Sequence, residues 1–429
     1  MTSVVESTER RGAPWQSPAA GTVRVALAGC GAVGSALLRE LATRRESLES
    51  RRGMRVRLTR VLVREIARER NAPFDRSLLT ADLELFLDSE ADVVIEAIGG
   101  IEPARRIAEW ALRGGRELVT ANKELLAAHG SSLAALARAH GGSLRYDAAV
   151  GGGVPVLRLL DDALGAGTPV RVRGILNGTT NFVLTRLERG ALLADALGAA
   201  RRAGFAEANA SRDLDGRDAA AKIALVAWAA YGLPPETLLV TRRSLLPDPG
   251  RHVRLGARFG RLARQVSECA LVDGAVVAKV EPLLVSPGTT LARVLDEQNQ
   301  VEVHNGWSAP LTASGPGAGG LPTATALLSD FLCTGRVPHR HAAMHAGGVD
   351  SRVAEWALEV DGAPALLHRT VPGCGLVHTD DRARSAWTLV RQATSAEMDA
   401  ILLVLASRGG DPIAVRFDDE GDVAAGAVS

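Results

Sequence analysis

The distribution of apolar and polar positions in the first half of the chain predicts strands that alternate with helices. Short apolar runs predict buried strands at residues 22–28, 55–63, 91–97 and 117–120. A helix is predicted from about residue 35 to residue 44, directly after the first strand. Strands that alternate with helices form a parallel sheet with helices on both faces. We therefore expect a doubly wound α/β domain over residues 21–150, completed by residues from about 316 to 345.

The pattern changes at about residue 150, where strands and helices stop alternating regularly. Beyond this point we predict strands at residues 170–176, 276–280 and 283–285 and helices at residues 218–228 and 322–330. This mixture indicates a second, α+β domain over residues 151–315.

The C-terminal segment, residues 350–429, has the pattern of a small third domain of βαββαβ order. Its strands are predicted at residues 353–360, 375–378, 386–391 and 412–417, and its helices at residues 363–370 and 397–408.

The composition is that of an ordinary globular protein and disfavours several classes of function. The 429 residues carry a net charge of +1, with 46% hydrophobic and 23% charged residues. Nucleic acids and anionic membranes are bound by an excess of basic charge, so we expect neither partner. The four cysteines are scattered without C-x-x-C spacing, which predicts neither disulfides nor structural zinc and indicates a cytoplasmic protein. Residues 1–20 lack an apolar stretch, so we expect a frayed tail rather than a signal peptide or membrane anchor.

Lysine is nearly absent from the chain, so the few lysines that remain are candidates for chemistry. Of the 50 lysine and arginine residues, only Lys123, Lys222 and Lys279 are lysine. Arginine keeps its proton at any pH that a protein survives, whereas a buried lysine can exchange its proton. Lys123 and Lys222 lie in compact polar motifs, which favours a catalytic role over chance survival in an arginine-biased composition.

A glycine-rich turn follows the first predicted strand and opens the first predicted helix. The segment from Gly29 through Gly31 to Gly34 has the G-x-G-x-x-G spacing of a Rossmann-type dinucleotide site. In that motif the first glycine permits the tight turn, the second lets the backbone approach the pyrophosphate, and the third lets helix and strand pack closely.

The end of the second strand bears on the choice of cofactor. Arg64, with Arg68 and Arg70 nearby, would neutralise the additional phosphate of NADP. We therefore favour NADP, while NAD stays open because these arginines are equally compatible with a solvated surface.

Asp218 and Lys222 stand four residues apart, which places them on one face of the helix predicted at residues 218–228. On a solvated face such an ion pair contributes only about 0.3–0.5 kcal/mol. The apolar run from Ile223 to Trp228 indicates instead that this helix enters the core.

Several motifs occur together in the order found in one enzyme family. They are the glycine-rich turn and the segments at residues 98–103, 120–123, 146–155, 174–182, 204–207 and 213–222. Through these motifs the chain from about Arg24 to Phe331 resembles homoserine dehydrogenase, and residues 350–429 resemble the regulatory ACT domain that many members carry. The resemblance implies an enzyme that interconverts L-homoserine and L-aspartate 4-semialdehyde with NAD(P), a step toward threonine, methionine and isoleucine. It also implies a homodimer, or a higher homo-oligomer, built through the middle domain, residues 151–315, which would bind the substrate.

The resemblance also assigns roles to individual residues. Lys222 would be the proton donor and acceptor for the substrate oxygen, beside Lys123 and Asp218. The substrate would be bound by Gly178, Thr179, Glu207, Asp213 and Asp218. The cofactor would be bound by Gly29, Gly31, Ala32, Val33, Gly34, Arg64, Ile98, Gly99, Thr120, Lys123, Gly204, Gly317 and Gly319. A monovalent cation such as Na⁺ would be held by Asp147, Val150, Gly152 and Val154.

The chemistry of these residue types agrees with those roles. Hydride transfer leaves an alkoxide or carbonyl oxygen that needs a proton source, and a substrate ammonium group needs carboxylates. No histidine lies in these motifs, which argues against a histidine-based dehydrogenase.

The sequence departs from the family pattern at three places. Asp147 stands where the family usually has glutamate, Asn209-Ala210 replaces the usual Asp-Pro, and residues 361–364 are only loosely similar to the ACT effector turn. Two alternatives stay open: an oxidoreductase for another amino alcohol or semialdehyde, and a catalytically silent paralogue that senses an amino acid.

Overall fold

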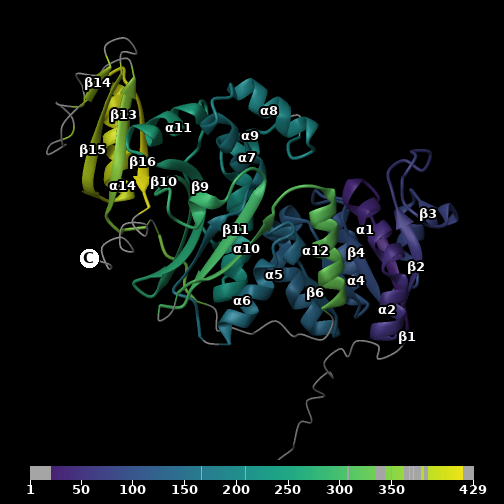
Figure 1. Cartoon of the computed structure of the whole chain (residues 1–429). Coiled ribbons are helices and arrows are strands. Elements are labelled where there is room, and N and C mark those ends of the chain that lie inside the picture. Colours follow the sequence, from purple (N-terminus) through teal and green to yellow (C-terminus); the bar gives the residue numbers. More distant parts are fainter. Residues whose placement is uncertain are drawn as a thin grey trace, which may run out of the picture. The chain divides into compact units, whose positions relative to one another are not determined.

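The computed structural model forms two compact units (Figure 1). The first unit comprises residues 1–149 and 323–339, and the second comprises residues 150–322 and 340–429. The structure describes residues 21–165, 167–207, 209–306, 309–333, 344–348, 350–361, 367, 371, 378–380 and 385–418. The predicted N-terminal tail lies outside the described residues.

The first unit is built on a six-stranded parallel sheet in the order β3-β2-β1-β4-β5-β6. Its strands are β1 (Gly21–Ala28), β2 (Met54–Leu62), β3 (Leu79–Thr80), β4 (Val93–Glu96), β5 (Glu117–Thr120) and β6 (Ser143–Arg145). This is the strand order of doubly wound dinucleotide-binding domains. The predicted fold class is thereby confirmed, and the four predicted strands are all present.

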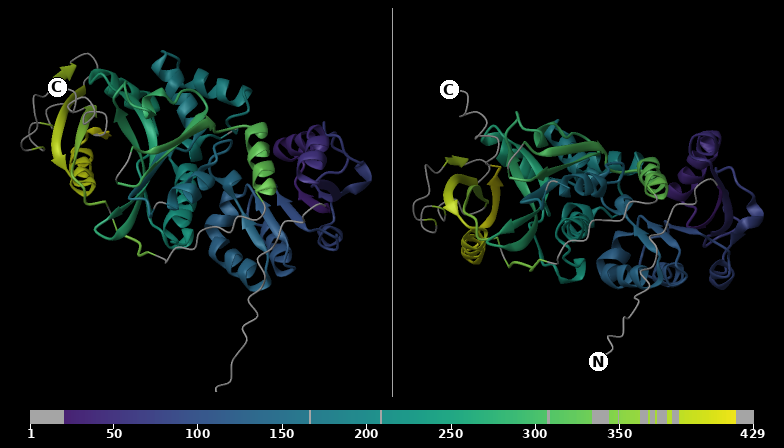
Figure 2. Two further views of the ribbon diagram at one scale, coloured as in Figure 1. Left: turned by 60° about the horizontal axis from the view of Figure 1, so that its bottom comes forward. Right: turned by 90° about the horizontal axis from the view of Figure 1, so that it is seen from below.

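Helices cover both faces of this sheet. Its helices are α1 (Ala32–Thr43), α2 (Arg45–Arg52), α3 (Leu83–Leu87), α4 (Ala104–Arg113), α5 (Lys123–His140) and the distant α12 (Gly320–Leu332). Leu37, Leu48 and Leu327 bury α1, α2 and α12 against one face, while Ile107 and Leu133 bury α4 and α5 in a second cluster with α3. In Figures 1 and 2 the green α12 lies beside the purple α1. Helix α1 begins at Ala32, earlier than predicted, because the end of the glycine-rich turn already has helical backbone.

The second unit is built on a ten-stranded mixed sheet. The path of neighbouring strands is β12-β11-β7-β9-β10-β16-β13-β15-β14, and β8 pairs with β10. The strands up to residue 316 are β7 (Arg171–Ile175), β8 (Val240–Arg242), β9 (Leu262–Val272), β10 (Ala275–Val285), β11 (Gln298–His304) and β12 (Leu311–Pro316). The helices of this segment are α6 (Val156–Leu164), α7 (Gly178–Glu188), α8 (Leu193–Arg202), α9 (Ser211–Leu214), α10 (Arg217–Tyr231) and α11 (Pro249–Arg258).

Strand β10 corrects one prediction, because the strands predicted at residues 276–280 and 283–285 are a single strand that contains Pro282. Proline has no N–H group to donate to a neighbouring strand. The carbonyls of Val280 and Leu284 accept hydrogen bonds from Arg243 and Asp418 on the side of β10 that carries β8 and β16. The nitrogen of Pro282 faces the same side, at a position between these two hydrogen bonds. At that position β8 has already ended and β16 has not yet begun to pair, so the sheet loses no hydrogen bond.

The C-terminal strands extend the same sheet. They are β13 (Ala354–Asp361), β14 (His378–Asp380), β15 (Ser385–Ala393) and β16 (Asp411–Phe417), with helix α14 (Ser395–Ser407). Strand β16 pairs in parallel with β10, with Leu283 opposite Arg416. The predicted strands at residues 353–360, 386–391 and 412–417 and the helix at 397–408 are present, whereas the segments at 363–370 and 375–378 fall almost wholly outside the described residues. The division into functional domains stays a prediction.

Across the described ranges, no helix is both long and apolar enough to cross a membrane.

Candidate active site

The predicted cofactor residues of the first unit lie at the carboxyl ends of four adjacent parallel strands. Gly29 follows β1, Arg64 follows β2, Ile98 follows β4 and Lys123 follows β5 as the first residue of α5. The strand order reverses between β1 and β4. Ligands of open parallel sheets bind at this edge beside the reversal, so the arrangement fits a dinucleotide.

Two of the three glycines in the glycine-rich turn have no room for a side chain, and the third does. A Cβ atom at Gly29 would lie 2.6 Å from the Ala97 carbonyl oxygen, and one at Gly34 would lie 2.0 Å from the Gly29 carbonyl oxygen. Both positions are therefore closed by the protein itself. A Cβ atom at Gly31 would meet no described atom within 4 Å. Packing does not require glycine there, which is the result expected if a ligand approaches the backbone at Gly31.

The three arginines in the loop after β2, which were grouped together on the sequence, have different surroundings in the structure. Arg70 closes the loop by donating to the backbone carbonyls of Glu65 and Arg68, at 2.5 and 2.6 Å. Arg64 and Arg68 are exposed, and within the described residues neither of their side chains makes a hydrogen bond or ion pair. Arg64 is thus available to a ligand, whereas Arg70 is committed to the loop.

Sequence reasoning missed Glu96, which ends β4 and is fully buried. Its Oε1 atom accepts the backbone N–H groups of Ile98 and Gly99 at 2.9 and 3.2 Å. Its Oε2 atom accepts the Thr120 hydroxyl at 2.5 Å. The signal was present as an acidic residue at the end of an apolar strand, directly before two predicted cofactor residues.

In the second unit, the structure brings together a set of polar groups that we call the Lys222 cluster: Leu176, Asn177, Asp213, Asp218 and Lys222. The Lys222 Nζ atom donates to the Leu176 carbonyl at 2.8 Å and pairs with Asp218 Oδ2 at 2.9 Å. The Asn177 amide nitrogen donates to Asp213 Oδ1 and to Asp218 Oδ2, both at 2.8 Å. The Lys222 and Asp218 side chains are each 13% exposed, so the pair is not a solvated surface bridge.

Local sequence explains how the cluster is assembled. Asn177 caps α7 by accepting the Thr180 N–H at 2.7 Å, which fixes its side chain while the amide nitrogen reaches the two aspartates. Gly216, with φ of 80°, starts α10, and Asp218 occupies the first turn, where the helix dipole favours a carboxylate. Lys222 follows one turn later on the same face.

Glycines 152 and 317 allow two backbone segments of the second unit to cross beside this cluster. A Cβ atom at Gly152 would lie 2.5 Å from the Gly317 carbonyl oxygen, and one at Gly317 would lie 2.1 Å from Asn299 Cγ. The Asn299 amide nitrogen lies 3.4 Å from the Leu176 carbonyl that also accepts Lys222. The crossing therefore supports the carbonyl that orients Lys222. Gly319, with φ of 112°, follows in the same segment.

The remaining predicted substrate residues are only partly gathered at the cluster. Gly178 and Thr179 are the first two residues of α7 and are buried. The Thr179 hydroxyl donates a hydrogen bond to the Phe205 carbonyl at 2.5 Å. Gly204 and Glu207, on the segment that Thr179 holds, are exposed. The structure does not bring Glu207 into the Lys222 cluster.

The predicted cation residues offer oxygen atoms but no acidic cluster. Asp147 is 3% exposed in a short 3₁₀ turn, Asp147–Ala149. The Val154 carbonyl accepts the Val156 N–H at 2.9 Å, which leaves it one lone pair. Among the described residues no group of three histidine, cysteine or acidic side chains is placed to hold a metal ion.

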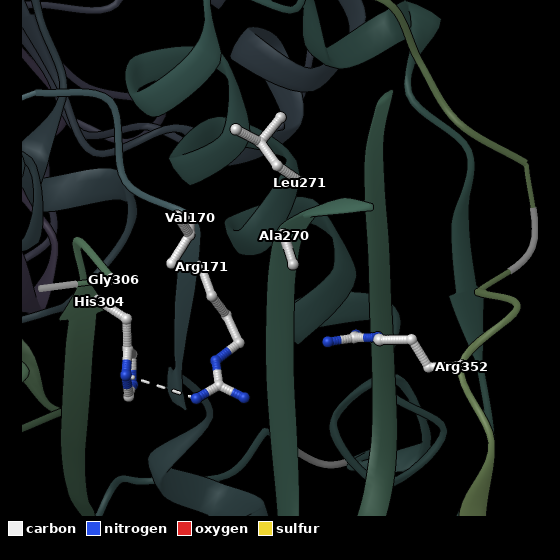
Figure 3. Close-up of a pocket in the computed structure, with 7 residues that line it drawn as sticks. All are labelled: Val170, Arg171, Ala270, Leu271, His304, Gly306 and Arg352. Atoms are coloured by element: carbon white, nitrogen blue, oxygen red, sulfur yellow. Dashed lines mark hydrogen bonds between the residues drawn. The ribbon is translucent and has the colours of Figure 1, made fainter. Parts of the chain in front are cut away.

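A cavity of about 410 Å³ in the second unit lies away from the Lys222 cluster (Figure 3). Arg171, His304 and Arg352 line it, together with Val170, Ala270, Leu271 and Gly306. It opens at the start of β7, whereas Leu176 and Asn177 follow the end of that strand. Arg352 already pairs with Asp350 and Glu268. None of the predicted site residues lines this cavity.

Comparison with known proteins gives consistent matches. A family model described as homoserine dehydrogenase matches residues 155–332, and one described as the NAD binding domain of homoserine dehydrogenase matches residues 29–147. The homoserine dehydrogenase of Bacillus subtilis is 32% identical over 312 residues, which are 72% of this chain and 72% of that relative. The Mycobacterium leprae homoserine dehydrogenase is 36% identical over 322 residues, 73% of each chain.

The chain belongs to the homoserine dehydrogenase family.

Solved homoserine dehydrogenases agree with this assignment. The crystal structure of the Thiobacillus denitrificans enzyme is 27% identical with a TM-score of 0.81, and the match covers 93% of this chain and 98% of that chain. A putative homoserine dehydrogenase from Archaeoglobus fulgidus is 28% identical with a TM-score of 0.63, covering 72% of this chain and 98% of that shorter chain. The predicted resemblance to homoserine dehydrogenase is confirmed, as is the class of nicotinamide-dependent oxidoreductase. The ACT-like character of the C-terminal segment and the roles of single residues stay predictions.

Proposed function

We propose that this chain catalyses the NADP-dependent interconversion of L-homoserine and L-aspartate 4-semialdehyde, with Lys222 as the group that moves the proton. The observation that carries the proposal is the Lys222 cluster, in which one of the three lysines of the chain is held by a carbonyl and a carboxylate. A lysine held in this way at low exposure is suited to proton transfer.

In the direction of reduction the Lys222 ammonium would give a proton to the substrate oxygen, and in the direction of oxidation the neutral amine would take that proton back. As an ammonium it has three N–H groups, of which Leu176 and Asp218 take two. Within the described residues the third finds no acceptor, so it is available to the substrate. The bound nicotinamide cofactor would supply or accept the hydride. Asp218, which Asn177 orients, keeps the ammonium aimed, and Asp213 offers a second carboxylate for the substrate ammonium group.

The first unit would bind the cofactor along the carboxyl edge of its sheet. The pyrophosphate would lie at the N-terminus of α1 against Gly31, and the end of β2 would meet the adenosine ribose. Arg64 would pair with the 2′-phosphate of NADP. Lys123, the first residue of α5, would contact the other half of the cofactor, whereas Thr120, at the end of β5, is fully buried and would act from behind it.

The preference for NADP gives the first prediction, which concerns Arg64. Arg64→Ala should weaken NADP binding about tenfold and leave NAD binding within about twofold, because only NADP carries the phosphate that a charge-assisted hydrogen bond would hold. Dissociation constants from cofactor fluorescence would check this. Arg51→Ala, at an exposed arginine of α2 in the same unit, is the matched control, and equal losses for NADP and NAD in Arg64→Ala would remove the case for NADP.

Three further expectations concern assembly, location and a bound cation. A homodimer formed through residues 151–315 and a cytoplasmic location rest on the family resemblance and on the free cysteines 30, 269 and 333. The monovalent cation rests on the carbonyls of Val150, Gly152 and Val154, which are oxygen donors of the kind that Na⁺ takes. Light scattering would measure the oligomeric state. Activity measured with Na⁺ replaced by a large organic cation would test for the monovalent cation.

The decisive experiment uses the purified full chain with NADP and a panel of amino alcohols, followed by absorbance of the reduced cofactor. Homoserine should give the highest kcat/KM. A higher value with another amino alcohol would favour a different oxidoreductase, and no signal with any of them would favour a silent paralogue.

A further inference from the structure

Glu96 is an uncommon residue for the core of a sheet. Its side chain is fully buried at the end of β4, and among the described residues no cation pairs with it. Removing a carboxylate from water without a counter-charge is costly unless hydrogen bonds take the place of the solvent. The question is therefore which groups satisfy it and what they hold in place.

Four groups donate to this carboxylate. They are the N–H groups of Ile98 and Gly99, the Thr120 hydroxyl and, at 3.5 Å, the Asn122 amide. The Thr120 oxygen accepts the Asn122 backbone N–H at 3.0 Å, so its own proton is left for Glu96. Burial raises the pKa of Glu96, and these donors oppose the rise by favouring the ionised form.

The donors come from two separate segments of chain. Ile98 and Gly99 belong to the turn after β4, and a Cβ atom at Gly29 would touch Ala97 in this turn, so it also abuts the glycine-rich turn. Thr120 and Asn122 belong to the segment that leads into α5, where Asn122 caps the helix by accepting the Leu125 N–H. The Asn122 amide also donates to the Gly100 carbonyl at 2.6 Å, which ties the two segments a second time.

These two segments flank one half of the cofactor site. In a doubly wound sheet the end of β2 meets the adenosine ribose and the turn after β1 meets the pyrophosphate. The nicotinamide half then lies over the ends of β4 and β5, where the Glu96 network lies.

We propose that Glu96 is a positioning residue for the nicotinamide half of the cofactor site: its carboxylate joins the turn after β4 to the segment that begins α5 and fixes both at the spacing that the cofactor needs. The inference rests on the proposed function, and it makes Glu96 part of the support for Lys123, the first residue of α5.

A second buried glutamate in the same sheet provides a contrast. Glu117 is the first residue of β5, so it lies at the amino ends of the strands, whereas Glu96 lies at their carboxyl ends. Glu117 is 1% exposed. Within the described residues neither of its carboxylate oxygens accepts a hydrogen bond. Arg145 Nε lies 3.7 Å from Glu117 Oε1, but among the described residues no side-chain hydrogen bond ties Glu117 to a second segment. Of these two buried glutamates on neighbouring strands, only Glu96 joins two segments of chain by side-chain hydrogen bonds.

The test compares Glu96→Gln with Glu117→Gln in the full chain. Dissociation constants for NADP and NADPH would be measured by fluorescence without homoserine, followed by kcat, both KM values and the thermal unfolding temperature. A glutamine has one acceptor oxygen, so it can serve the two backbone N–H groups or the threonine hydroxyl but not both. Glu96→Gln should weaken both cofactors about tenfold and raise the KM for NADP, with the KM for homoserine within about twofold. Glu117→Gln should leave cofactor binding and both KM values within about twofold.

A second pair keeps the inference testable if Glu96→Gln does not fold. Thr120→Val removes only the hydroxyl donor and should weaken cofactor binding about fivefold, whereas Thr120→Ser restores the donor and should bind within about twofold of the wild type.

Unchanged cofactor binding in Glu96→Gln, or an equal loss in Glu117→Gln, would overturn the inference. In the second pair, equal binding by the valine and serine variants would overturn it. Failure of the proposed function looks different, because the wild type would then bind cofactor without turning over homoserine.

Discussion

At the scale of single residues, the described partners of Lys222 hold its ammonium group but leave one of its N–H groups without an acceptor among the described residues. The Leu176 carbonyl and the Asp218 carboxylate occupy two of its N–H groups and fix its direction. The Asn177 amide in turn fixes Asp218. The third N–H group is the one that the proposed reaction uses.

Substitution of Lys222 by arginine separates charge from proton transfer. Lys222→Arg should lower kcat by about a thousandfold or more with unchanged cofactor affinity, because arginine keeps a positive charge but does not exchange its proton. Lys279→Arg is the matched control: this lysine is buried among Asp350, Glu281 and Glu268, away from the Lys222 cluster, and kcat should stay within about threefold. Near-normal turnover in Lys222→Arg would contradict the assigned role.

The residues of this site could be predicted from the sequence better than the hydrogen bonds that join them. The spacing of Asp218 and Lys222 and the downstream apolar run predicted a buried pair, and the structure confirms that geometry. The Leu176 carbonyl could not be foreseen, because a backbone acceptor carries no signature in the side-chain sequence. Glu96 was missed because it sits in an apolar run, and its four donors come from residues that fold next to it. Glu207 was placed by resemblance alone, and the structure leaves it exposed.

At the scale of elements, the boundaries were predictable where a strong local signal exists. Strand β5 has the predicted limits, and α10 begins within a residue of the predicted start, because glycine and an acidic first turn mark it. Strand β10 was predicted as two strands on either side of Pro282, a residue that is normally excluded from the middle of a sheet. Only the positions of β8 and β16 reveal that Pro282 falls in a gap between partners, and those strands are distant in sequence.

Strand β5 supplies a prediction about pH. Burial raises the pKa of Glu117 to about 7, and Arg145, at 3.7 Å, only partly opposes the shift. A carboxyl group whose pKa is higher in the folded state stabilises the protein at low pH and loses this contribution as the pH rises from the unfolded value of 4.5 through about 7. Glu117→Gln should remove the loss, which is at most about 3 kcal/mol.

Urea unfolding near pH 5 and near pH 8 would measure this effect. The wild type should lose more of its free energy of unfolding than Glu117→Gln between the two conditions. Parallel pH profiles for the two proteins would show that Glu117 is not the titrating group.

At the scale of the whole molecule, the C-terminal segment is joined to the rest of the second unit by charge as well as by strand pairing. Its acidic residues pair with buried basic residues: Asp350 with Lys279, Glu359 with Arg251, and Asp418 with Arg173. The sequence predicted the order of its elements, but the buried ion pairs were not predictable, because alternating charges on a strand normally indicate a solvated face.

Deletion of residues 349–429 tests how far the second unit depends on this segment. The deletion removes these acidic partners and exposes the β10 edge at Leu283 and Leu284, so we expect an aggregating protein with a markedly lower unfolding temperature. Solubility and thermal unfolding beside the full chain would check this. A soluble truncated protein that melts at the full-length temperature would show that the second unit does not need the segment.

Helix α12 has a consequence for how the protein is made. The sheet that receives the cofactor is encoded before residue 150, yet Ala324, Leu327, Leu328 and Phe331 complete one of its two apolar layers. A ribosome must therefore translate the whole intervening part before the earliest segment to emerge can close its core. Domains generally fold in the order of their synthesis. Here one apolar layer of the N-terminal sheet can be completed only after α12 has been synthesised.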